Sequence, residues 1–205
     1  MKSLNINSII RKKRFKYYPP KTIDIGRVDP NLLNRDFNCN APNQKWVTDK
    51  TYLKYDNGRK RMYLSTIEDL YNREIIAYKI SYILDISFVE QTLGEAFKKV
   101  KTSELNNLII HSDQGCYHKS NIYKSTLKKY GVKQSMSRKG NCYDNACIEN
   151  FFGYLKTELI YQNSYSCKEE LIKSIDDYIY WYDNHRFQAK LKNMTPLEYR
   201  CHMIA

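Results

Sequence analysis

The chain has 205 residues, 42% of them hydrophobic, which suits one folded domain with a core and excludes an intrinsically disordered chain. Lys and Arg number 34 against 22 Asp and Glu, and the net charge of +12 favours a polyanionic partner such as nucleic acid, although charge alone does not exclude a basic protein without one. No apolar run is long enough to span a membrane and no signal-peptide core is present, so we expect a cytoplasmic protein without membrane contact.

The N-terminal segment is basic and precedes the expected core. Residues 1–20 carry six Lys and Arg side chains and no acid, among them Arg11, Lys12, Lys13 and Arg14. Such an arm either contacts phosphates without reading sequence or is a solvated tail with no partner. Residues 21–43 predict a linker with at most a short helix. We therefore expect an arm and linker over 1–40 and a core domain over 41–202.

The core begins with three strand-like runs. Residues 45–55 are rich in β-branched and aromatic side chains, and the Asp-Asn-Gly at 56–58 predicts a hairpin turn to a second strand over 61–70. A third strand is expected over 74–83, which makes an antiparallel meander. The two-residue period of a strand puts one set of side chains of the first run on a common face: Val47, Asp49, Thr51 and Leu53.

Strands and helices alternate after the meander and give way to helices. The pattern predicts a helix over 87–100, a short strand over 107–110, a helix over 119–130, a fifth strand over 132–136 and a mobile loop over 137–144. Together these elements predict an α/β fold with a mixed five-stranded sheet, three antiparallel strands and then two more, flanked by helices and followed by a helical extension.

Two amphipathic helices end the predicted core. The first covers 144–161 and carries Glu149 and Lys156 seven residues apart, so both can face one ligand. The second covers about 167–186, and Ser166 with Glu169 reads as a capping box at its start.

Three carboxylates stand out in this pattern. Sixty-three residues separate Asp49 from Asp113, and 35 separate Asp113 from Glu149. The first lies in a strand, the second follows a buried strand and precedes a glycine turn, and the third lies on an amphipathic helix. Converging acids repel unless a cation holds them, and an all-oxygen site favours Mg²⁺ or Mn²⁺ and phosphodiester chemistry. Singly, each acid also fits an edge position, an Asx turn or a solvated helix face.

The six cysteines give no specific metal pattern, because no CxxC pair is present. Cys116 and His118 with Cys142 and Cys147 could be drawn as a zinc site, but free reduced thiols are the preferred interpretation.

Several segments resemble one known family. WVTDKTYL, DLYNREI, HSDQG, SRKGNCYDNACIENFFGYLKTE and YDNHR…LKNMTPLEYR are similar to the integrase-core transposases of bacterial insertion sequences, of the OrfB type, relatives of retroviral integrases. The resemblance runs from about Asn34 to Arg200. It implies an RNase H-like fold and a D-D-35-E triad in which Asp49, Asp113 and Glu149 are the catalytic residues and bind two Mg²⁺, with Mn²⁺ as a substitute.

The resemblance also implies the reaction and the partners. The expected activity is metal-dependent cleavage of DNA at element ends and strand transfer to target DNA in the bacterial cytoplasm. A homo-oligomer assembled on DNA and a helical DNA-binding partner from an upstream frame are expected. The alternative is a truncated or catalytically inactive DNA-binding fragment that modulates a full-length transposase. A plain RNase H-like nuclease is a third possibility, which the flanking motifs disfavour.

Further side chains are candidates for DNA contact. Lys156 could bind terminal phosphates or simply face solvent, and Arg138 and Lys139 could follow the DNA backbone from the loop. Asn145 could orient Glu149 or cap its helix. Asp69 is expected to be a turn residue rather than a fourth site acid, and the Asn-His-Arg at 184–186 to dock the C-terminal tail rather than touch DNA.

Three departures from the family pattern are visible. The first residues look like the end of an upstream helical module, so 1–40 is read as its remnant. Lys50 stands where an apolar residue is expected, either stabilising the neighbouring anion or facing solvent. Cys116-Tyr117-His118 departs from the expected order of an aromatic, a histidine and a tyrosine.

Overall fold

A mixed five-stranded sheet with the strand order β3-β2-β1-β4-β5 organises the chain. The computed structural model describes residues 26–204, so Arg11, Lys12, Lys13 and Arg14 lie outside the described residues. Strands β1 (Lys45–Tyr55), β2 (Lys60–Asp69) and β3 (Ile75–Ser81) pair antiparallel, while β4 (Ile109–Ser112) and β5 (Lys133–Met136) run parallel to β1. The predicted mixed sheet is confirmed.

The hairpin between β1 and β2 forms where the sequence predicts it. Asp56, Asn57 and Gly58 have φ of 53°, 52° and 81°, the left-handed conformation that Asp, Asn and Gly adopt most readily. The Gly58 amide donates to the Tyr55 carbonyl at 3.1 Å and closes the turn.

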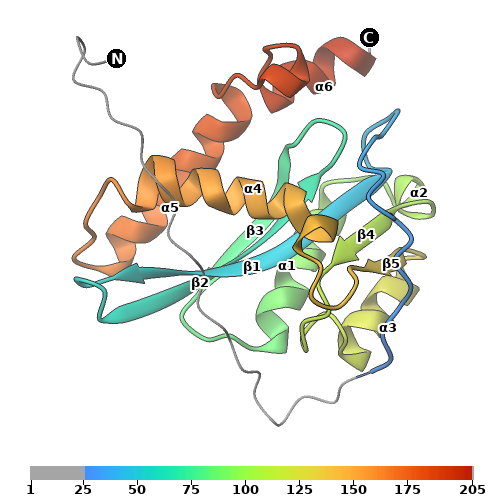
Figure 1. The fold of residues 1–205 in the computed structure, drawn as a ribbon, viewed down its shortest axis with the longest axis horizontal. Helices are drawn as coiled ribbons and strands as arrows, with labels where there is room; N and C mark the ends of the chain where they lie inside the picture. Colours follow the sequence, from blue (N-terminus) through green and yellow to red (C-terminus); the bar gives the residue numbers. More distant parts are fainter. Residues whose placement is uncertain (1–25, 205) are drawn as a thin grey trace.

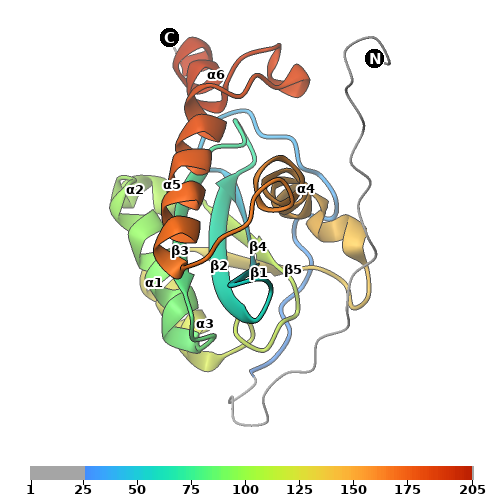
Figure 2. The same ribbon diagram turned by 90° about the vertical axis from the view of Figure 1, so that its left-hand side faces the viewer.

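Helices cover both faces of the sheet, as Figures 1 and 2 show. On one face Val47 and Leu53 of β1 pack in a cluster with α4 (Ala146–Tyr154) and α5 (Lys168–Asn184). On the other face Trp46 packs in a cluster with α1 (Ile86–Lys98) and α3 (Asn121–Lys129). Successive residues of β1 therefore bury opposite faces, as its alternating pattern predicts.

The helices of the second face begin at side-chain caps. Asp85 accepts from the Phe88 amide at 2.9 Å at the start of α1, and Ser120 accepts from the Tyr123 amide at 3.2 Å at the start of α3. A single turn, α2 (Thr102–Leu105), precedes β4 and was not predicted. No helix within residues 26–204 has the length and apolar character needed to cross a bilayer.

The predicted continuous helix over 144–161 is wrong in detail. A 3₁₀ turn over Cys142–Asn145 leads into α4, and a π-helical segment, η3 (Leu155–Ile160), follows it. The Tyr161 amide donates to the Lys156 carbonyl at 2.8 Å, five residues back. The Thr157 hydroxyl donates to the Gly153 carbonyl at 2.8 Å, a back-bond of the kind that bends helices and that periodicity does not reveal.

The C-terminal helices depart from the prediction at their caps. Glu170, not Glu169, closes the box at α5, because its carboxylate accepts from both the Ser166 amide and hydroxyl, at 2.9 and 2.8 Å. A last helix, α6 (Pro196–Ile204), follows a 3₁₀ turn over Ala189–Leu191 and was not predicted.

A capping box marks the start of α6. The Thr195 amide donates to the Glu198 carboxylate at 2.9 Å, and the Glu198 amide donates to the Thr195 hydroxyl at 3.2 Å. The Thr-Pro-Leu-Glu motif at 195–198 is therefore the sequence pattern that indicates this helix start.

The C-terminal segment is docked by charge pairs. Arg186 donates to Glu158 at 2.7 Å and lies 4.2 Å from the Tyr154 ring centroid, which confirms docking for this residue. Arg200 of α6 pairs with Glu74 at 2.6 Å. The tail is thereby held on the β2–β3 turn and on the α4 side of the sheet.

Asp69 is a structural residue, as predicted. It is fully buried at the end of β2 and accepts from the Asn43 amide at 2.8 Å and the Tyr71 amide at 3.0 Å. Burial raises its pKa to about 6, against the effect of these two bonds.

Asp183 of α5 predicts a pH dependence of stability. It accepts from the Ile75 amide at 3.0 Å, and burial raises its pKa to about 8. Because the unfolded carboxyl ionises near pH 4 and the folded one does not, this residue lowers the free energy of unfolding as pH rises from 4 to 8. Asp183→Asn keeps the acceptor, so we expect it to raise that free energy at pH 8 by on the order of 2 kcal/mol and to have little effect at pH 4.

Urea denaturation of wild type and variant at both pH values measures this difference. The exposed Asp177 of the same helix, changed to Asn, is the control and should leave the pH dependence unchanged. An Asp183→Asn variant that is equally or more destabilised at pH 8 than at pH 4 contradicts the assignment.

Candidate active site

Asp49 lies in the middle of β1, nearly buried at 9% exposure. One carboxylate oxygen accepts from the Lys50 amide at 2.7 Å, and the other accepts from the Asn145 side-chain amide at 3.3 Å. Asn145 makes no capping bond to its own helix, so the predicted capping role is wrong and its contact is to Asp49 rather than to Glu149.

Asp113 follows β4 and leaves the sheet beside Asp49. Thr48 is paired with Ser112 in the parallel register of β1 and β4, so the next residue of each strand emerges at the same edge. One Asp113 oxygen accepts from the Gly115 amide at 2.9 Å and from His118 Nδ1 at 2.8 Å. Its side chain keeps 41% of its exposure, so a ligand can reach it.

Cationic and polar neighbours keep Asp113 ionised. Burial opposes ionisation, but the Lys50 ammonium, the His118 hydrogen bond and the Gly115 amide outweigh it and hold the pKa of Asp113 well below its usual range. Burial lowers the pKa of His118, so the ring is neutral near pH 7 and its Nδ1–H donates to the carboxylate. The Lys50 ammonium also lies 5.1 Å from the Tyr117 ring centroid.

Gly115 permits this close approach. A Cβ atom there would lie 2.8 Å from an Asp113 oxygen and 3.1 Å from Lys50 Nζ, so these two side chains would have to shift. Lys50, read from sequence as either a stabiliser of an anion or a solvent-facing residue, thus acts on Asp113. His118 was noted only as a departure from the family pattern and as part of a zinc alternative.

Glu149 lies on α4, one helical turn after Asn145. Residues four apart share a helix face, and Asn145 bonds Asp49, so this face is turned towards β1. Ile148 and Phe151 pack in the same cluster as Val47 and hold the helix there. The helix that carries Glu149 therefore packs against the strand that carries Asp49, and Asp113 leaves the sheet at the end of the neighbouring strand.

Lys156 reaches the same face of β1 from η3. Its ammonium lies 2.5 Å from the Thr51 hydroxyl, two residues beyond Asp49 on the strand. Arg138 and Lys139 are exposed in the loop after β5.

Asp144 was not predicted as a site residue, yet it ties that loop to the linker. It is fully buried and accepts from the Asn31 amide, the Arg35 guanidinium and the Arg138 backbone amide, at 3.0, 2.9 and 3.0 Å. Burial opposes ionisation, but these bonds lower its pKa overall. Its partner Arg35 lies 109 residues away, and no local pattern pairs them.

The carboxylate oxygens of Asp49, Asp113 and Glu149 are suitable ligands for a divalent cation, although the distances between the three side chains are not those of a metal site. Carboxylate oxygens are the ligands of hard cations, and Asp113 already sits against a positive charge. Within residues 26–204 no three His, Cys, Asp or Glu side chains are close enough together to hold a metal ion. The zinc alternative finds no support there: His118 bonds Asp113, and Cys116 and Cys147 are free buried thiols.

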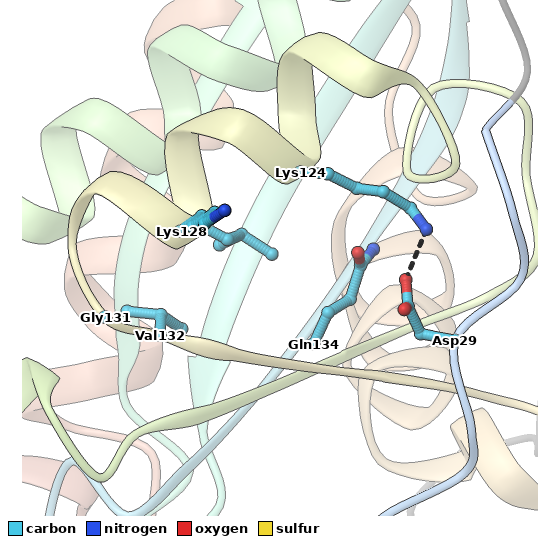
Figure 3. Close-up of a pocket in the computed structure, with 7 residues that line it drawn as sticks. Asp29, Lys124, Lys128, Gly131, Val132 and Gln134 are labelled. Carbon is cyan, nitrogen blue, oxygen red and sulfur yellow. Dashed lines mark ion pairs between the residues drawn. The ribbon is translucent and has the colours of Figure 1, made fainter.

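A cavity of about 330 Å³ lies between α3 and the linker (Figure 3). Lys124 reaches across it to Asp29 at 2.6 Å. Gln134, beside that pair, donates to the His118 carbonyl at 2.7 Å. None of the three acids lines this cavity, whose lining residues are Asp29, Lys124, Leu127, Lys128, Gly131, Val132 and Gln134.

Comparison of the sequence with protein families gives two matches, both described as Integrase core domain. The first covers residues 40–142 and the second covers residues 149–204. Asp49 and Asp113 fall in the first match, and Glu149 is the first residue of the second.

Curated relatives include transposases of insertion sequences. The chain is 44% identical over 200 residues to the putative transposase InsK of IS150 from Escherichia coli, covering 98% of this chain and 68% of that protein. It is 38% identical to an uncharacterized transposase-like protein of Haemophilus influenzae, covering 98% and 89%. It is 34% identical to the transposase of IS904 from Lactococcus lactis, covering 91% and 72%.

Solved structures share the fold at low identity. The integrase chain of a simian T-cell lymphotropic virus intasome, in complex with the PP2A subunit B56 gamma, superposes with a TM-score of 0.65 at 16% identity, covering 89% of this chain and 60% of that one. The HTLV-2 integrase catalytic core in complex with magnesium gives 0.56 at 15% identity, covering 78% and 97%. These similarities confirm the RNase H-like architecture.

Removal of the Asp144 carboxylate tests its structural role. Asp144→Ala leaves Arg35, Asn31 and the Arg138 amide without their shared acceptor, so we expect the free energy of unfolding to fall by about 3 kcal/mol. Amide hydrogen exchange should accelerate over 31–35 and 138–143 and stay unchanged in α1. Asp177→Ala, at an exposed position of α5, is the control. Equal exchange rates over 31–35 and 138–143 in the two variants would contradict the assignment.

Proposed function

Because the chain belongs to the integrase core domain family and is a DNA-cutting and DNA-joining enzyme of the transposase kind, we propose that Asp49, Asp113 and Glu149 are its catalytic residues. One observation carries this proposal. The parallel register of β1 and β4 sets Asp49 beside Asp113, and Asn145 links Asp49 to the helix that carries Glu149.

The three carboxylates would hold Mg²⁺ or Mn²⁺, two ions per site. Magnesium is present in the solved HTLV-2 core, and the oxygen donors here suit the same hard cations. When bound, the ions supply Lewis-acid activation of the attacking hydroxyl and charge for the leaving oxygen.

Residues around the triad set the positions of its carboxylates. Asn145 orients Asp49 through its amide, and the Gly115 amide and His118 restrain one oxygen of Asp113. Lys50 supplies positive charge to Asp113 before the ions arrive, which reduces the repulsion between the acids. The exposed face of Asp113 is the side from which a phosphodiester enters.

The substrate is DNA at the ends of an insertion element, followed by target DNA. In the first step water attacks a phosphodiester, the bond from phosphorus to the 3′-oxygen breaks, and a 3′-hydroxyl and a 5′-phosphate result. In the second, that 3′-hydroxyl attacks a target phosphodiester and one P–O bond replaces another, so no external energy source is needed. Lys156, Arg138, Lys139 and the arm residues Arg11, Lys12, Lys13 and Arg14 would contact DNA phosphates.

Assembly on DNA is the expected working state. One structural neighbour is part of an intasome. We propose a homo-oligomer on DNA, together with a helical DNA-binding partner from an upstream frame. The chain spans 68% of the length of the IS150 relative. The proposed partner would supply recognition of the element's ends.

Replacement of Asp113 tests the site assignment. Asp113→Asn removes one anionic ligand without changing side-chain size, so we expect Mg²⁺-dependent nicking and joining of element-end DNA to fall by more than about 100-fold. Glu149→Gln should give the same loss. Both variants should keep the wild-type melting temperature, since neither residue is part of the core. Their affinity for DNA should stay within a few-fold of the wild-type value.

The control makes the same chemical change elsewhere. Asp85→Asn replaces an exposed carboxylate at the start of α1, where asparagine also caps a helix, and should leave joining unaffected. Undiminished joining by Asp113→Asn would show that the triad is assigned wrongly. DNA binding without metal-dependent chemistry in wild type would favour the inactive fragment.

A further inference from the structure

The edge of β1 is open beyond the catalytic end of the sheet. Pairing with β4 stops at Thr48, whereas β1 continues to Tyr55 and keeps pairing with β2 only. In the described part of the chain, no strand pairs with residues 50–55 on the β4 side. The β1–β2 hairpin therefore projects past the end of β4 (Figure 1).

An exposed aromatic ring lies on this projection. Tyr52 is 43% exposed and lies three residues after Asp49, about 10 Å along the strand. The two-residue period places it on the same face of β1 as Lys50, which acts on Asp113. The ring is therefore close to the site and open to a ligand.

Two cations flank the ring. The Arg61 guanidinium lies 5.5 Å from its centroid and Lys156 Nζ lies 5.7 Å from it. A ring of this kind, held among cations on a strand, is the arrangement with which proteins bind unpaired nucleotides: the ring stacks on a base and the cations contact phosphates.

The β1–β2 hairpin carries several positive charges whose mutual repulsion lowers its stability. Lys54 lies directly opposite Arg61 across the two strands, and like charges in that position are destabilising without a counter-ion. Arg59 and Lys60 add two more exposed cations at the tip, where Asp56 pairs with Lys60 at 3.3 Å. The Asp56 amide donates to the Tyr165 carbonyl at 2.8 Å, which holds the tip in place.

We propose that Tyr52 and the cations of the β1–β2 hairpin form a subsite for unpaired nucleotides next to the reacting phosphodiester. The proposal rests on the proposed function, because it takes its ligand from the DNA that the three acids cut. Bases inside a duplex are already stacked on each other, so only a frayed or single-stranded end offers a free face to the ring. Phosphates of the bound strand then offset the repulsion between Arg61 and Lys54.

Binding of two DNA probes to the full chain tests the subsite. One is a labelled duplex with a short single-stranded overhang and the other is the blunt duplex of the same sequence, both measured by fluorescence anisotropy without divalent ions. We expect wild type to prefer the overhang, and Tyr52→Ala to weaken binding of the overhang by about 5- to 100-fold with little effect on the blunt duplex. Tyr52→Phe keeps the ring and should bind like wild type.

Charge is tested separately. Arg61→Gln should reduce the slope of log affinity against log salt for the overhang by about 0.7, the value for one single-strand phosphate contact. Lys98→Gln makes the same charge change on α1, outside the β1–β2 hairpin, and is the matched control. Tyr52→Leu preserves apolar packing if the alanine variant does not fold, and should lose the same preference.

Two outcomes overturn the subsite. One is a wild-type chain that binds both probes equally or binds neither. The other is a folded Tyr52→Ala or Tyr52→Leu variant that keeps the full preference for the overhang. Either result leaves the triad assignment standing if Asp113→Asn still abolishes joining, so failure of this inference is distinct from failure of the proposed function.

Discussion

Carboxylates that converge repel one another, and the arrangement of the candidate site depends on how this repulsion is offset. In the described structure the offset comes from the chain itself: Lys50 and His118 act on Asp113, and the Asn145 amide bonds Asp49. The absence of a side chain at Gly115 lets Lys50 and Asp113 approach. A lysine beside the first acid therefore does in the metal-free protein part of what cations would do during the reaction.

The sheet separates this chemistry from the interactions that hold the domain together. Around the β2–β3 turn, Asp69 and Asp183 are buried and accept backbone amides, while Glu74 anchors Arg200 of the last helix. Burial raises the pKa of Asp69 and of Asp183, and Glu74 has a cationic partner, so these acids serve the fold. Within residues 26–204, β1 has no pairing strand on its β4 side beyond Thr48, and this edge carries instead Asp49, Tyr52 and the β1–β2 hairpin.

Several features that depend on neighbouring residues in the sequence are predicted correctly in this chain. Alternation in β1, the Asp-Asn-Gly turn and the buried run before Asp113 correctly predict the mixed five-stranded sheet, with Asp49 in a strand and Asp113 directly after one. The π-helical turn at Lys156 escapes prediction because helix periodicity looks the same on either side of it. The bond between Arg35 and Asp144 escapes because it joins residues 109 apart. The roles of Asp49, Asp113 and Glu149 as metal ligands stay predictions.

Anomalous diffraction at the manganese edge, from crystals of the full chain with element-end DNA and Mn²⁺, tests the central claim most directly. The account predicts manganese peaks ligated by the carboxylates of Asp49, Asp113 and Glu149, with the Lys50 ammonium displaced from Asp113. Manganese bound elsewhere, or a DNA-bound site in which Lys50 keeps its place against Asp113 and no ion is present, would contradict it.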